Sequence, residues 1–140
     1  MKPKLHVVHG PDRAVLIADL GPLDPGPSGW SIARCDQRFR LVDVEINASF
    51  PRPRLERLVR RIPGVGRIVG WIFRARDADD RARATALAKI EHVAVGGAVC
   101  PPDEVDDLPT AAVGTEISVR VTNAGSRPIV ARVIVEGVTS

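Results

Sequence analysis

Short runs of Val, Ile and Leu, repeatedly interrupted by Gly and Pro, constrain the fold of this 140-residue chain more than any other feature; Gly and Pro number 12 each. The clearest run, 39–47, alternates with the period of two that a half-buried strand requires. Val42, Val44 and Ile46 are expected on one buried face, with Leu41, Asp43 and Glu45 on the solvent-exposed face. The chain is therefore predicted to be mainly β.

Two further apolar runs near the N-terminus predict a strand, a turn and a second strand. They cover residues 5–9 and 14–20, and Gly10-Pro11-Asp12 supplies the turn between them. The following segment, 21–31, holds three prolines and three glycines, so we expect an irregular loop there. Trp30 is expected to anchor this loop to the core.

The C-terminal region predicts a hairpin of two alternating strands, 116–122 and 129–136, joined by turn residues 123–126. The second strand is apolar on part of both faces, so it lies inside a sandwich or is covered by a neighbouring subunit. Its core positions are expected to be Ile129, Val133 and Val135. Val130 and Ile134 are expected on the face shared with another subunit.

In the middle of the chain the apolar period changes from that of a strand to that of a helix. Leu55, Leu58, Val59 and Ile62 have the spacing of an amphipathic helix, which Pro63-Gly64 ends. A second apolar cluster follows, and its Trp71 and Phe73 are expected at the assembly interface together with Val130 and Ile134. The resulting expectation is a single antiparallel β-sandwich over 1–140, with the jelly roll as one arrangement open to it, and a short amphipathic helical insertion around 55–76.

The segment before the last strands allows two interpretations. Residues 81–88 are either a short Ala-rich helix with aspartates at its N-terminal end or the start of a strand that continues through 90–95. We favour a turn leading into the strand. A loop with Pro101, Pro102 and four acidic residues is expected next.

Charge is concentrated in the Arg-rich segment 51–76, which carries a net charge of +7 because eight arginines accompany one glutamate, whereas residues 77–140 carry −4. These arginines either pair with the acidic groups, within a chain or between copies, or contact an anionic partner. That partner would be nucleic acid, or a membrane surface with Trp71 and Phe73 inserted. The anion-facing candidates are Arg57, Arg60, Arg61, Arg67 and Arg74.

No catalytic or metal-binding pattern is recognisable in the sequence. His6 and His9 lie three apart on a strand and so point to opposite faces, and Cys35 and Cys100 lack the spacing of a zinc site. Both cysteines are expected to be reduced thiols. The predictions are therefore no enzyme activity, no metal or other cofactor and no small-molecule substrate.

Targeting signals are also missing from the sequence. The first ten residues hold no hydrophobic stretch after their two lysines, and no apolar run reaches the roughly 20 residues needed to cross a bilayer. We therefore expect neither a signal peptide nor a transmembrane segment.

The C-terminal third resembles a known family. Val95-Gly96-Gly97, a Pro-rich loop, the run 114–123, Arg127-Pro128 and a final Glu136-Gly137 are together similar to the closing hairpin of small jelly-roll coat and decoration proteins of phages and viruses. The resemblance implies a subunit that forms rings, trimers or shells through sheet edges and extended arms. Its partners would be copies of itself or another coat protein, in a virion or in the cytoplasm of the host cell.

Two functions therefore follow from the sequence. The first is a non-enzymatic structural protein that self-assembles as a capsid or capsid-decoration subunit. The alternative is a binding module that uses the segment 51–76 to contact anionic lipid or nucleic acid.

Overall fold

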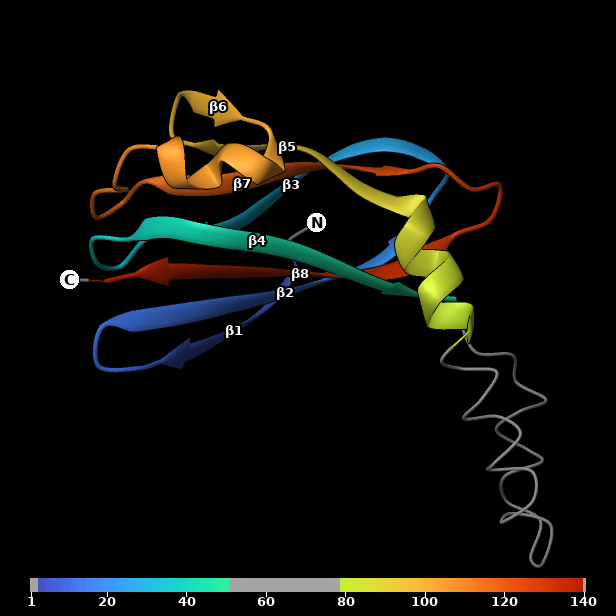
Figure 1. Cartoon of the computed structure of the whole chain (residues 1–140), viewed down its shortest axis with the longest axis horizontal. Helices are drawn as coiled ribbons and strands as arrows, with labels where there is room; N and C mark the ends of the chain where they lie inside the picture. Colours follow the sequence, from blue (N-terminus) through green and yellow to red (C-terminus); the bar gives the residue numbers. More distant parts are fainter. Residues whose placement is uncertain (1–2, 51–78, 140) are drawn as a thin grey trace, which may run out of the picture.

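A computed structural model describes residues 3–50 and 79–139, which form two four-stranded antiparallel sheets (Figure 1). Sheet A has the strand order β1 (Lys4–His9), β2 (Arg13–Leu23), β8 (Ile129–Val138), β4 (Arg40–Ser49). Sheet B has the order β3 (Gly26–Arg34), β7 (Glu116–Asn123), β5 (Ala88–Val95), β6 (Ala98–Cys100). A 3₁₀ helix, η1 (Pro102–Asp107), and a helix over 79–87 complete the described structure. The predicted mainly-β antiparallel sandwich is confirmed.

One long antiparallel ribbon runs through both sheets. β2 pairs with β8 from Arg13 opposite Val138 to Leu23 opposite Ile129, and β3 then pairs with β7 from Gly26 opposite Asn123 onward. The connection from β2 to β3 and the connection from β7 to β8 pass between the two sheets at the same corner. β4 and β5 lie along the other side of β8 and β7, which are therefore internal strands of their sheets.

The predicted hairpin is wrong in its pairing, although both of its strands exist. β7 and β8 are consecutive in sequence but lie in different sheets, because each turns its apolar face toward the shared core. Asn123 fixes the corner between them: its buried amide nitrogen donates to the carbonyls of Leu23 (3.1 Å) and Arg127 (2.8 Å), and its oxygen accepts from the Gly125 N–H (2.9 Å). A buried amide bonded in this way resists displacement of the corner.

The Gly- and Pro-rich segment 21–31 is extended strand rather than the predicted loop. β2 continues to Leu23 and β3 begins at Gly26, with Gly21 (φ 74°) and Gly26 (φ 107°) adopting backbone angles that other residues rarely reach. β1 pairs with β2 only up to Asp19, and β3 is an edge strand. The prolines of this segment therefore lie where a strand tolerates a missing N–H. Trp30 packs against the core, as predicted.

Because of a bulge in β4, the buried side chains of that strand differ from those predicted. The register against β8 shifts between Leu41 and Asp43, so Val42 is the extra residue. Leu41 is fully buried at 0% exposure, whereas Val42, which period two predicts to be buried, is 43% exposed. The core positions Ile129, Val133 and Val135 of β8 are all fully buried, as predicted.

Residues 79–87 form a helix, so the favoured interpretation of a turn leading into the strand is wrong and the helical alternative is right. Ala84 is fully buried, and Asp79 lies 3.2 Å from Arg83, one helical turn away. The predicted helix over 55–62 and the second apolar cluster lie outside the described residues.

Shortening Leu41 tests the bulge. Leu41→Ala should lower the free energy of unfolding by about 2–5 kcal/mol, because it leaves a cavity in the core. Val42→Ala, the neighbouring control, should change it by less than about 0.5 kcal/mol, as exposed substitutions do. Urea denaturation followed by Trp fluorescence measures both, and equal losses would contradict the bulged register.

Candidate functional site

The two predicted interface residues of β8 lie on the outer face of sheet A. Val130 and Ile134 are both half-buried, and Ile134 stands opposite Ile17 of β2 and Glu45 of β4. The structure thus brings together two of the four predicted assembly residues. Trp71 and Phe73 lie outside the described residues, as do the five arginines Arg57, Arg60, Arg61, Arg67 and Arg74.

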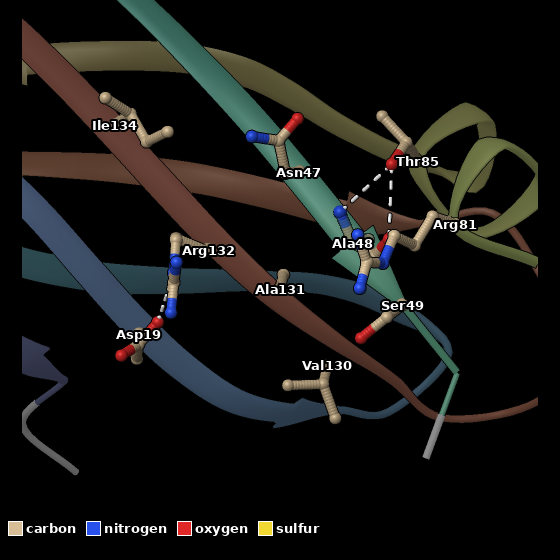
Figure 2. Close-up of a pocket in the computed structure, with 10 residues that line it drawn as sticks. All are labelled: Asp19, Asn47, Ala48, Ser49, Arg81, Thr85, Val130, Ala131, Arg132 and Ile134. Carbon is tan, nitrogen blue, oxygen red and sulfur yellow. Dashed lines mark hydrogen bonds and ion pairs between the residues drawn. The ribbon is translucent and has the colours of Figure 1, made fainter. Parts of the chain in front are cut away.

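A hollow of about 570 Å³ lies beside this face, between sheet A and the helix over 79–87 (Figure 2). Its polar lining comes from β2, β4, β8 and the helix, and Val130, Ala131, Ile134 and Ala48 complete it. The polar residues are Asp19, Asn47, Ser49, Arg81, Thr85 and Arg132.

Thr85 holds the helix against the end of β4. Its hydroxyl accepts a hydrogen bond from the Ala48 N–H at 3.1 Å and donates one to the Ala48 carbonyl at 3.2 Å (Figure 2). These are the backbone groups that an edge strand would otherwise leave unpaired. The contact therefore positions the helix as one wall of the hollow. It also provides hydrogen-bond partners for the Ala48 N–H and carbonyl at the edge of β4.

Arg132 and Asp19 form an ion pair across the neighbouring strands β8 and β2. The Arg132 Nε lies 2.7 Å from Asp19 Oδ1, and His6 Nε2 of β1 lies 3.8 Å from the other oxygen of the same carboxylate. The pair is largely solvent-accessible, so it contributes at most about 1 kcal/mol. Among the described residues lining the hollow, Asp19 is the only carboxylate and none is Cys or His. The lining therefore offers hydrogen-bond donors and acceptors beside the apolar side chains of Val130 and Ile134.

The open side of the sandwich forms a second, apolar groove between β1 and the β3–β4 connection. One part, of about 150 Å³, is lined by Leu5, Val7, Leu16 and Phe39 among others, and a second part of about 310 Å³ also includes Leu5. Leu5 and Val7 face inward, opposite the buried Ala18 and Leu16, yet are 39% and 42% exposed. β1 therefore stands at the rim of the core.

Both cysteines are free thiols, as predicted. Cys35 lines the apolar groove, and burial, followed by the nearby Asp36 carboxylate, raises the pKa of its thiol. Burial also raises the pKa of Cys100, and the carboxylates of η1, Glu104 foremost, add to the effect. Since the thiolate is the reactive form, both cysteines are poor nucleophiles at neutral pH.

Within residues 3–50 and 79–139, no three His, Cys, Asp or Glu side chains gather closely enough to hold a metal ion. None of the helices in that part of the chain is both long and apolar enough to cross a membrane. No protein-family model matches the chain, and comparison with curated proteins and with solved structures gave no significant match.

Sequence reasoning missed the polar lining of the hollow. Asp19 and Arg132 are 113 positions apart, and Thr85 and Ala48 are 37 apart, so only the strand pairing and the helix position bring them together. The one signal available was the outward face of the last strand, where Arg132 lies between Val130 and Ile134.

Removing the Thr85 hydroxyl tests the anchor of the helix. Thr85→Val should reduce the free energy of unfolding by about 1 kcal/mol, because both Ala48 backbone groups lose their partner. Thr85→Ser keeps the hydroxyl and should stay close to the wild type. Urea denaturation measures both variants, and a Thr85→Val protein as stable as the Ser variant would contradict the anchoring role.

The raised thiol pKa predicts slow alkylation of Cys35. A pKa above the ordinary value leaves less thiolate at any given pH, so maleimide labelling at pH 8 should be slower in the folded chain than in urea. The folded-state rate should still rise at a pH where labelling of the unfolded chain has levelled off. Mass spectrometry of a Cys100→Ser variant isolates Cys35, and equal rates in the two states would refute the prediction.

Proposed function

We propose that this protein is a non-enzymatic structural subunit that self-assembles, as the coat or coat-decoration protein of a virus-like particle, and that its sandwich is a jelly roll. The observation that carries the proposal is the continuous ribbon of β2 and β3 against β8 and β7.

The path of this ribbon supports the jelly roll over a plain meander. A jelly roll is a double sheet of antiparallel strands with two Greek-key connections. Here the chain leaves sheet A after β2, returns to it at β4, passes to sheet B for β5 through β7 and comes back with β8 between β2 and β4. Such wrapping inserts the last strand between two early ones, which simple up-and-down connections do not do.

The outer face of sheet A supports a role in contact with other subunits. Ile17 and Ile134 face each other at its centre and are only half-buried, and Val130 continues the apolar surface toward the hollow. Polar groups surround these side chains, because Asp19 pairs with Arg132 (2.7 Å) and Arg13 with Glu136 (3.2 Å) on the same face. On the outer face of sheet B, Glu91 bonds both Arg120 (2.9 Å) and Thr122. A partly exposed apolar patch rimmed by polar residues is typical of an interaction site.

The charge distribution along the chain also supports assembly. The segment 51–76 carries +7 and the segment 77–140 carries −4, so neighbouring copies can place opposite charges against each other. A packaged nucleic acid would be an alternative counter-charge for the arginines within the same particle.

Size-exclusion chromatography with light scattering, followed by negative-stain imaging, tests the proposed function. The purified chain should elute as uniform assemblies many times heavier than its 15.1 kDa mass, seen as rings or shells. Ile134→Asp should reduce the assembled fraction, because it places a charge in an apolar contact. Ser118→Asp, half-buried on the polar outer face of sheet B, is the matched control.

A chain that stays monomeric at high concentration would overturn the proposal. If such a monomer binds oligonucleotides or anionic vesicles with an affinity that falls steeply with salt, the binding-module alternative replaces it. In assembled particles, a raised 260 nm absorbance would assign the arginines to nucleic acid.

A further inference from the structure

We propose that the free edge of β1 pairs antiparallel with β1 of a second copy across a two-fold axis, so that sheet A continues from one subunit into the next. This inference rests on the proposed self-assembly and names one of its contacts.

Within residues 3–50 and 79–139, β1 is a regular sheet edge that no other strand covers. All six of its residues are exposed, and its register with β2 is uninterrupted from Lys4 to His9. The strand holds neither Pro nor Gly, and its one permanently charged residue is Lys4. Proteins normally protect such an edge, because its free N–H and C=O groups are a template for another strand.

The other three sheet edges in the described structure are less suited to pairing. β4 is covered at its start by the bridge between Phe39 and Ala111 and at its end by Thr85. β3 is interrupted by glycines, Pro27 and a register shift, and β6 has only three residues. Of the four edges in the described structure, β1 is therefore the one best suited to pairing with another strand.

The sequence of β1 complements itself. A two-fold axis perpendicular to the sheet requires one residue to face its own copy, and directly opposite residues share a face. With His6 on the axis, Leu5 of each strand stands opposite Val7 of the other, twice. Lys4 then stands opposite Val8, so no permanent charges of like sign oppose each other.

This register explains the exposure of the groove residues. Leu5 and Val7 point to the core side yet remain 39% and 42% exposed, since β1 stands at the rim of the sandwich. Pairing of two copies packs these four side chains against one another. A second copy is therefore a better occupant of the edge than a strand of unrelated pattern.

Cysteine cross-linking tests the register directly. In a Cys35→Ala, Cys100→Ser background, His6→Cys should give a disulfide-linked dimer of twice the 15.1 kDa chain mass under mild oxidation. Opposed residues of paired strands lie within the Cα range that a disulfide spans. Val8→Cys is the matched control, because its two copies would be roughly 13 Å apart along the strands.

Charge substitutions test the same contact without oxidation. Leu5→Lys combined with Val7→Lys places lysines opposite each other and should weaken dimerisation at least about tenfold in apparent Kd. Leu5→Glu combined with Val7→Lys places opposite charges together and should restore most of the affinity. Val99→Lys, an exposed substitution on β6, should leave dimerisation unchanged.

The outcomes separate this inference from the proposed function. Cross-linked dimers without larger particles would support β1 pairing and overturn the coat role. Particles in which His6→Cys cross-links no better than Val8→Cys, or which tolerate the double lysine variant, would overturn β1 pairing and leave the coat role standing. A monomer that does not cross-link would overturn both.

Discussion

The simultaneous pairing of β8 with β2 on one side and β4 on the other is the constraint on which the rest of the structure depends. Its inward side chains Ile129, Val133 and Val135 are fully buried, so β8 supplies the floor of the core as well as the ladder of sheet A. The corner at Asn123 joins β8 to the preceding strand β7, which is likewise an internal strand, in sheet B. A strand bonded on both sides cannot slip by one residue without turning its apolar face to solvent.

The proposed contact surfaces follow from this arrangement because they belong mainly to sheet A. An internal β8 places Val130 and Ile134 at the middle of the outer face, next to Ile17 of β2. In the described part of the chain, the sheet ends at β1, which no further strand covers and which lies at the rim of the core. β4, at the opposite edge, is held by Thr85 and by the bridge at Phe39. The two edges of sheet A therefore differ. The ends of β4 are bonded to other parts of the chain, whereas the outer edge of β1 is available for pairing.

Several polar groups of the described residues hold neighbouring strands or corners in place. Asp19 is held by Arg132 at the hollow, Glu91 by Arg120 on sheet B, and the Asn123 amide by three backbone groups. The thiols have raised pKa values, which suppresses their nucleophilic form. These observations are compatible with the proposed structural role, which the assembly experiments test.

The sequence by itself determined where alternation is unbroken: the strands, the buried face of β8 and the outward placement of Val130 and Ile134 all follow from period two. It could not determine the bulge that exposes Val42, because a bulge is defined by the register of β4 against β8. The alternation of apolar residues along β4 does not show that register. Only the tertiary structure decided that 21–31 is strand, that 79–87 is helix, and that β7 and β8 lie in different sheets. The same holds for the hollow, whose Asp19 and Arg132 meet across 113 positions. Local periodicity fixes which side of a strand is buried, whereas its partner and register are chosen by packing between segments far apart in the chain.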